Sequence, residues 1–260
     1  MAGERGEVPN LPVSALLDRY REDVAKHKKG AKWECIRLES MGRDRIASVR
    51  LRSLDAPHVS DWQKRRLEAV SGASVRRERN LLNHVFEIAR KEWRWLTKNP
   101  FDGVRRPKDS KPRDRIATDK EIGLLTDGEA EMCRVVVFAL ETGMRASEIA
   151  SNPVIRGKVA ILGDSKTGEG RSVPLSAKAI AAYGEGFTLT AGSISTLFAR
   201  RCKELEIEGL TFHDLRHTAA TRLSKKLDVW ELAKMFGWKD LKIPLNTYYK
   251  SDAEETAKKL

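Results

Sequence analysis

The chain has 260 residues, enough for one large or two ordinary domains with a buried core. Its hydrophobic content of 40% and charged content of 33% are typical of globular proteins, and no apolar run approaches the length of a membrane span. The polar start lacks the apolar core of a signal peptide, so we expect a cytoplasmic protein with no membrane partner.

The net charge of +12 indicates a polyanionic partner, and the excess lies in the first half of the chain. Residues 11–115 contain 27 Lys and Arg against 15 Asp and Glu, whereas residues 116–260 contain 21 against 20. This division is typical of a nucleic-acid-binding segment joined to a segment with another task. Basic residues that merely keep a domain soluble are the alternative interpretation.

The three cysteines, Cys35, Cys133 and Cys202, are far apart and have no Cys-x-x-Cys or nearby histidine spacing. We therefore expect neither a disulfide nor a metal site. Each is expected to pack as a small buried apolar residue.

The first half has a helical period throughout. Ser14, Ser60 and Ser74 are expected to begin helices, and a further helix is expected near residues 33–41. The longest helix starts at Ser74, and Asn99-Pro100 marks its end. Its apolar stripe consists of Val75, Leu82, Val85, Phe86, Ala89 and Trp93.

The other faces of this longest helix are rich in arginine, the side chain best suited to phosphate contact. The residues that we expect to contact DNA are Arg76, Arg77, Arg79, Arg90 and Lys91. We expect a disordered start at 1–10, a helical DNA-binding domain at 11–103 and a basic, proline-containing linker at 104–115. A second domain would then occupy residues 116–260.

The second half begins with a predicted capping box at Thr118, followed by an apolar helix over residues 131–140. After a glycine turn comes Arg145, with Glu148 three residues on. The spacing lets the carboxylate orient the guanidinium toward a cleft, although a surface ion pair has the same spacing.

Residues 157–175 change to a strand period and predict a β-hairpin with a glycine-rich tip. Lys166 lies at this tip. A lysine there can reach a bound phosphate and act as a general acid, or it can be a solvated turn residue. No nucleotide-binding glycine pattern surrounds it.

The stretch Thr-Phe-His-Asp-Leu-Arg-His, residues 211–217, predicts a helix start at Thr211 with Asp214 in the first turn. His213 and Arg216 then share one face. An imidazole and a guanidinium at a helix N-terminus provide a proton carrier and an oxyanion clamp, for which a phosphate group is the natural ligand.

The last part of the chain predicts a helix over residues 229–236, capped by Asp228 and ended by Gly237. Trp238 follows directly, and it can donate a hydrogen bond or fill the core. The adjacent Tyr248 and Tyr249 come next. A phenol is a poor nucleophile unless cations stabilise its phenolate.

In chain order, Arg145 with Glu148, Lys166, His213-x-x-Arg216, Trp238 and Tyr248 resemble the constellation of the tyrosine site-specific recombinases of phage-integrase type. The resemblance covers the second half, and the first half resembles the family's helical core-binding domain in architecture alone. It implies a mainly α protein with a small β-hairpin or sheet. This would form a two-lobed DNA clamp with an α+β catalytic domain.

The resemblance also implies a mechanism. Arg145 and Arg216 would hold the scissile phosphate, Lys166 would protonate the leaving 5′-hydroxyl, and His213 would assist proton transfer. Tyr248 would form a 3′-phosphotyrosyl link, with no ATP, metal or other cofactor. The implied partners are double-stranded DNA, three further protomers docked through residues 251–260, and accessory DNA-bending or directionality proteins.

Some alternatives stay open. The interval from Trp238 to Tyr248 is one residue longer than is usual in the family, which leaves Tyr249 as a rival nucleophile. The segment between Ile149 and Gly157 is short, and it is expected to lack the tryptophan-containing strand that many relatives place there. A type IB topoisomerase and a non-catalytic DNA-binding regulator are the alternative functions.

Overall fold

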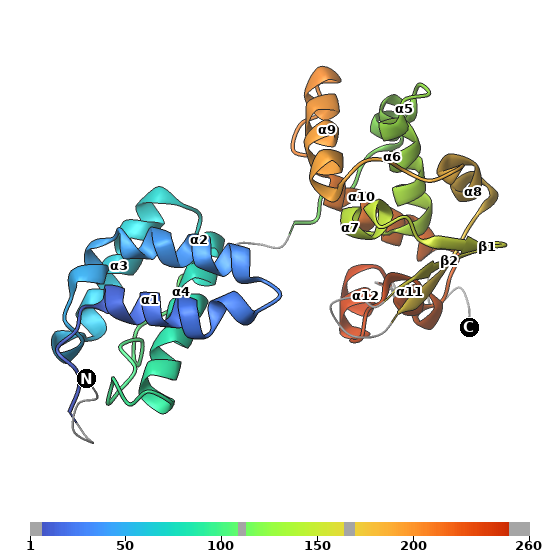
Figure 1. The fold of residues 1–260 in the computed structure, drawn as a ribbon. Coiled ribbons are helices and arrows are strands. Elements are labelled where there is room, and N and C mark those ends of the chain that lie inside the picture. The colour runs from blue at the N-terminus through green and yellow to red at the C-terminus, as the bar shows by residue number, and fades with distance from the viewer. Residues whose placement is uncertain (1–6, 109–112, 164–169, 250–260) are drawn as a thin grey trace, which may run out of the picture. The chain divides into compact units, whose positions relative to one another are not determined.

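The computed structural model describes residues 7–108, 113–163 and 170–249. The chain divides into two compact units, Met1–Pro112 and Arg113–Leu260 (Figure 1). The boundary between them falls inside the segment 104–115. Within the described ranges, no helix is both long and apolar enough to cross a membrane.

The described part of the first unit is helical, and short 3-10 turns join its longer helices. Its elements are α1 (Val13–Asp23), η1 (Ala25–His27), α2 (Ala31–Gly42), η2 (Arg45–Ser48), η3 (Leu51–Ser53), α3 (Ala56–Ala69) and α4 (Gly72–Lys91). The core is built around Tyr20, Trp62 and Phe86, whose side chains are completely buried. The α4 stripe faces this core as its spacing predicts, but the helix ends at Lys91 and not at Asn99-Pro100, so Trp93 lies beyond it.

Three helices of this unit begin earlier than the serine positions predict. Asp55, rather than Ser60, caps α3, and Ser71, rather than Ser74, caps α4. Ser14 lies inside the first turn of α1, whose first N–H bonds to a later backbone carbonyl. Each helix extends toward the N-terminus until another group satisfies its free N–H donors, so a serine inside the first turns does not by itself mark the start.

The second unit combines helices with a small sheet. Its described elements are α5 (Asp119–Thr126), α6 (Glu131–Thr142), α7 (Ala146–Ala150), β1 (Val154–Arg156), β2 (Val159–Leu162), β3 (Arg171–Pro174), α8 (Ala177–Tyr183), α9 (Ala191–Glu204), α10 (Phe212–Leu223), α11 (Val229–Phe236) and α12 (Lys242–Thr247). The apolar helix α6 packs against α5, α8, α9 and α10, and it therefore forms the centre of the core. The capping box predicted at Thr118 and the helix cap predicted at Asp228 are both present.

The sheet is antiparallel, in the order β1-β2-β3. The predicted hairpin is confirmed, with Leu162 paired to Arg171 in its register. A strand does form between Ile149 and Gly157, where β1 pairs with β2, although it contains no tryptophan, so the expectation of a missing strand is wrong. Only three residues form this strand, which is too short for a recognisable alternation. The mainly α class with a small sheet is confirmed.

Candidate active site

The centre of the site is Arg216, which lies on α10 and is only 6% exposed. Its Nη1 donates to the carbonyl oxygen of Gly143 and its Nη2 to that of Phe236, each at 2.6 Å. Its guanidinium carbon also lies 4.7 Å from the ring centroid of Phe236. No ion pair joins it to a carboxylate among the described residues, so the positive charge is held by carbonyl dipoles.

Both carbonyls come from helix C-termini, where the partial charge is negative and favours a cation. The helices α6 and α11 end in Gly143 and Gly237, whose φ angles of 64° and 67° are left-handed. A side chain at Gly143 would lie 2.3 Å from the Phe236 ring. Glycine is therefore required at this helix end for it to approach Arg216 and Phe236 so closely.

Burial lowers the pKa of Arg216 to about 9, and the positive charge of Arg145 adds to this effect. Two guanidinium groups are thus close enough to repel each other, while Arg216 lacks a carboxylate partner in the described chain. An anion between them would relieve both the desolvation and the repulsion. The site is therefore suited to a phosphate group.

Arg145 is held by a carboxylate that also serves a second arginine. Glu148 accepts hydrogen bonds from Arg145 Nη1 at 2.9 Å and from the Arg145 backbone N–H at 2.7 Å. Arg171, on β3, binds the same carboxylate at 2.6 and 2.8 Å through both of its terminal nitrogens. Burial alone would raise the pKa of Glu148, but Arg171 and Arg145 together hold it at about 2.

Arg171 in turn fixes the end of α11. Its Nε donates to the carbonyl of Met235 at 3.0 Å, next to the carbonyl that binds Arg216. The side chains of Arg171 and Glu148 are both 13% exposed. The pair therefore links the hairpin, the start of α7 and the end of α11 around Arg216.

His213 lies in the first turn of α10, at the surface of the site. Desolvation of the ring lowers the pKa of His213, and the nearby His217, Arg216 and Arg145 lower it further. At neutral pH the neutral imidazole is therefore favoured. In this form His213 offers one donor and one acceptor to a ligand.

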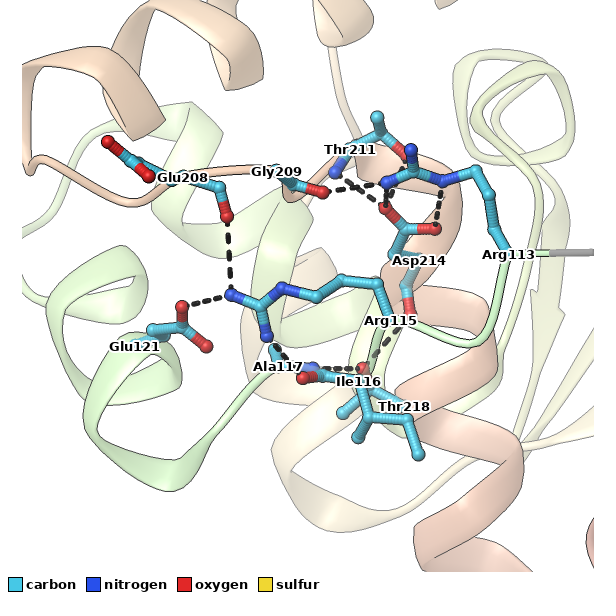
Figure 2. Close-up of polar contacts among 10 residues, drawn as sticks. All are labelled: Arg113, Arg115, Ile116, Ala117, Glu121, Glu208, Gly209, Thr211, Asp214 and Thr218. Carbon is cyan, nitrogen blue, oxygen red and sulfur yellow. Dashed lines mark hydrogen bonds and ion pairs between the residues drawn. The ribbon is translucent and has the colours of Figure 1, made fainter. Parts of the chain in front are cut away.

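The first turn of α10 is fixed from outside the helix by Arg113 (Figure 2). Arg113 binds both oxygens of Asp214, at 3.2 and 2.7 Å, and the carbonyl of Gly209 at 2.7 Å. Asp214 also accepts from the backbone N–H and the hydroxyl of Thr211. The helix start predicted at Thr211 is confirmed, and the buried Asp214 orients the turn that carries His213.

Arg115 makes a second attachment of the same segment, to Glu121 and to the carbonyl of Glu208 (Figure 2). Two residues after Arg115, the backbone N–H of Ala117 donates to Thr218 Oγ1 at 2.9 Å. The last residues of the expected linker 104–115 are therefore bound to the second unit.

Tyr248 lies at the end of α12, next to α10. Its hydroxyl makes a 2.8 Å hydrogen bond with Nδ1 of His217, the residue that follows Arg216. Trp238 stacks on the Tyr248 ring, with centroids 5.5 Å apart and planes at 16°. Trp238 also stacks on Phe236, with ring centroids 4.7 Å apart. Trp238 therefore fixes the plane of the phenol ring.

Tyr249 points elsewhere. Its hydroxyl donates to the carbonyl of Leu227 at 2.6 Å, beyond the end of α10. Burial raises the pKa of both tyrosines, but Arg216 opposes this effect for Tyr248, whereas Asp228 and Glu231 reinforce it for Tyr249. The electrostatic surroundings therefore favour a phenolate at Tyr248 over one at Tyr249.

Two expected parts of the site lie outside the described residues. These are Lys166, at the hairpin tip, and the segment 251–260. Among the residues that are described, no cluster of His, Cys, Asp and Glu could hold a metal ion. Cys133 and Cys202 are buried as expected, whereas Cys35 is half-buried, and all three are free.

The predicted DNA-contacting residues of α4 differ in their surroundings. Arg77 and Lys91 are exposed, and Arg90 and Lys91 both pair with Glu87. Arg79 does not fit the prediction, because it is only 4% exposed, lies over the Phe101 ring and donates to the carbonyl of Val104. Position 79 falls on the flank of the apolar stripe, so helical packing covers it.

Two residues of the site were not predicted from the sequence, His217 and Arg171. His217 follows His213 by four residues and so shares its helix face, which is a signal that was available. Arg171 lies two residues before the buried Val173 on β3, and therefore on the same face of the strand, but its long-range partner, Glu148, is 23 residues away on α7. Only the tertiary packing of the second unit brings these two together.

The fold is shared with known recombinases. The structure of a lambda integrase tetramer bound to a Holliday junction matches with a TM-score of 0.75 and 18% identity, over 95% of this chain and 81% of that one. The chain therefore has the fold of an integrase.

Sequence comparison identifies the family. An integrase/recombinase-type protein of Haemophilus influenzae is 34% identical over 98% of this chain and 92% of its own length. A shufflon-specific DNA recombinase of Escherichia coli is 33% identical over 90% of this chain and 68% of its own length. The model of the phage integrase family matches residues 185–255. The chain belongs to this family, the tyrosine recombinases, which are enzymes that cleave and rejoin DNA.

Proposed function

We propose that this protein is a site-specific recombinase that cleaves DNA with Tyr248 and stores the broken bond as a 3′-phosphotyrosyl ester. The single observation that carries the proposal is the position of the Tyr248 hydroxyl. This hydroxyl is hydrogen-bonded to His217, the residue next to Arg216. Arg216 is buried and has no carboxylate partner among the described residues. A phosphate bound by Arg216 would therefore lie beside the phenol.

In this mechanism Arg145 and Arg216 bind the non-bridging oxygens of the scissile phosphate, and they neutralise the charge that builds up in the transition state. Glu148 holds Arg145 in place, His213 assists proton transfer and Trp238 positions Tyr248. Lys166 protonates the leaving 5′-oxygen, a role that rests on the resemblance alone. Because the ester conserves the bond energy, we propose that the reaction needs neither ATP nor a metal.

The test is covalent trapping on nicked DNA fragments taken from the sequences that flank the gene for this protein. The buffer contains a chelator and no ATP. The wild type is expected to form an adduct that survives a denaturing gel, as is Tyr249→Phe. Tyr248→Phe is expected to form none, because it lacks the attacking oxygen. Circular dichroism and DNA binding serve as controls for folding.

Loss of the adduct in Tyr249→Phe alone would keep the enzyme class and move the nucleophile. Absence of any wild-type adduct despite DNA binding would favour a regulator without cleavage. Adducts at every sequence tested, together with relaxation of plasmids without a target site, would favour a topoisomerase.

We further propose that the first unit holds the DNA backbone through basic residues of α4, chiefly the exposed Arg77 and Lys91 and the half-buried Arg90, with Arg76 beside them. Arg77→Gln is expected to weaken binding about equally for all sequences, and to reduce the slope of log K against log salt by about 1. Arg79→Gln is the matched control on the same helix. This variant is expected to lower the thermal stability of the unit, because the Arg79 guanidinium packs on the Phe101 ring and donates to the carbonyl of Val104.

The measurement is a salt titration of binding by fluorescence anisotropy, with thermal melts of both variants. An unchanged salt slope in Arg77→Gln would remove this residue from the proposed contact. We also propose a tetramer on paired DNA sites, by analogy with the lambda integrase assembly. The docking segment 251–260, accessory DNA-bending or directionality proteins and a cytoplasmic location remain expectations from the sequence.

A further inference from the structure

His217 is in direct contact with the atom that attacks phosphorus in the proposed function, and no step described so far uses it. Its Nδ1 lies 2.8 Å from the Tyr248 hydroxyl oxygen. Its ring also lies edge-on to His213, with centroids 5.7 Å apart. Among the described residues, the Tyr248 hydroxyl has no other hydrogen-bond partner, so the direction of this bond decides what His217 does.

We propose that His217 is a further catalytic residue of this site and accepts the proton of the Tyr248 hydroxyl as its oxygen attacks the phosphate. This inference rests on the proposed function, because it requires Tyr248 to be the nucleophile. The protein then contains two imidazoles with separate tasks: His217 serves the nucleophile and His213 faces the bound phosphate.

A proton acceptor is needed because Tyr248 is protonated at neutral pH. Burial raises the pKa of its phenol above the usual value, and Arg216 only partly offsets this effect. A neutral phenol that attacks phosphorus must lose its proton during the step. An imidazole is the side chain best suited to receive a proton at this pH.

The other neighbours of Tyr248 are unsuited to this task. The guanidinium of Arg216 and the indole N–H of Trp238 are donors only. Trp238 contacts the face of the phenol ring, not its hydroxyl. For Nδ1 of His217 to accept, the ring must carry its proton on Nε2, and this tautomer is what the inference requires.

The bond from Tyr248 oxygen to phosphorus forms while the bond from phosphorus to the 5′-oxygen breaks. The Tyr248 proton moves to His217 Nδ1, and the leaving oxygen takes a proton from the general acid, for which Lys166 is proposed. On rejoining, the 5′-hydroxyl attacks phosphorus and gives its proton back to the residue proposed as the general acid, while the imidazolium of His217 returns its proton to the departing phenolate.

The test compares single-turnover cleavage of nicked DNA by the wild type, His217→Ala and His217→Asn. Asparagine can keep a hydrogen bond to Tyr248 but cannot take its proton. Both variants are expected to cleave at least about 100-fold more slowly, within the range for loss of a general base. Added imidazole is expected to restore part of the rate in His217→Ala and none in His217→Asn.

DNA with sulfur in place of the 5′-bridging oxygen separates the two ends of the reaction, because a thiolate leaves without a general acid. On this sulfur-containing substrate the His217 variants are expected to cleave as slowly as before. Variants of a residue that protonates the leaving group are expected to regain their cleavage rate. Thr221→Ala, one turn further along α10, is the matched control, and it is expected to cleave at the wild-type rate. Melting temperature and DNA binding are measured for every variant.

A rate for His217→Asn within about three-fold of wild type would overturn the inference, as would full rescue of His217→Ala by the sulfur substrate. If the variants do not fold, ¹⁵N NMR of histidine-labelled wild type decides the matter. Nδ1 of His217 protonated at neutral pH would overturn the proposal, whereas an Nε2–H tautomer would support it.

The failures of the two proposals are distinguishable. A wild-type adduct that disappears in Tyr248→Phe but forms in the His217 variants within about three-fold of the wild-type rate would overturn this inference and leave the proposed function intact. Absence of any wild-type adduct, or an adduct that depends on Tyr249, would overturn this inference together with the assignment of Tyr248 as the nucleophile.

Discussion

Replacement of Arg216 by lysine or alanine is expected to slow DNA cleavage by at least about 100-fold. Loss of one preorganised oxyanion donor costs on the order of 100- to 1000-fold in rate in other enzymes. Lysine keeps the charge, but it cannot bond both helix-end carbonyls and a phosphate through a planar fork. The carbonyls of Gly143 and Phe236 would also lose their donor, which costs about 1 to 3 kcal/mol for each buried group left unpaired.

The measurement is single-turnover adduct formation, together with thermal melts and DNA binding. Arg222→Ala is the matched control, since Arg222 is exposed on the last turn of the same helix. It is expected to leave cleavage unchanged. Adduct formation by Arg216→Lys within a few-fold of wild type, in a folded variant, would show that Arg216 supports the fold and not the chemistry.

Replacement of Glu148 by alanine is expected to lower the free energy of unfolding of the second unit by about 3 to 5 kcal/mol. Removal of one member of a buried ion pair leaves the other charge uncompensated, and losses of this size are typical. Here Arg171 would remain 13% exposed, without the carboxylate that binds two of its nitrogens. The same change frees Arg145, so cleavage is also expected to fall.

The pH dependence of stability provides a second measure of this pair. The pKa of Glu148 is lowered from 4.5 to about 2 in the folded protein, so its stabilising effect is complete above about pH 4.5. It is lost as pH falls toward 2, and it amounts to about 3 kcal/mol. In urea unfolding followed by tryptophan fluorescence, Glu148→Gln is expected to lose less stability than wild type between pH 7 and pH 3.

Glu129→Gln is the control for this experiment, because Glu129 is exposed and its removal leaves no buried charge. It is expected to follow the wild type at each pH. Equal losses in wild type and Glu148→Gln on acidification would contradict the role assigned to the pair.

Local patterns in the sequence determined much of the secondary structure of this protein. The capping residues Thr118 and Asp228, the hairpin period and the left-handed glycine at the end of α11 act over a few residues, and each was predicted correctly. The spacing of His213 and Arg216 likewise placed both on one helix. These features depend on backbone hydrogen bonds and side-chain periodicity, which neighbouring residues control.

The choice between neighbouring candidates needed the tertiary structure. Tyr248 and Tyr249 are adjacent in sequence and chemically identical, yet one bonds to His217 and the other to the carbonyl of Leu227. The direction of each hydroxyl follows from how the end of α12 packs on α10. Burial of Arg79 is a similar case, because the helix period places it beside a stripe without saying how far the stripe extends.

The local sequence therefore determined which residue types are candidates for the proposed chemistry and on which elements they lie. Only the tertiary structure decided how they act together. Arg216 binds a carbonyl 73 residues away, and Arg171 binds a carboxylate 23 residues away. Such contacts depend on which helix ends and strands pack together, a property of the whole core that no local pattern records.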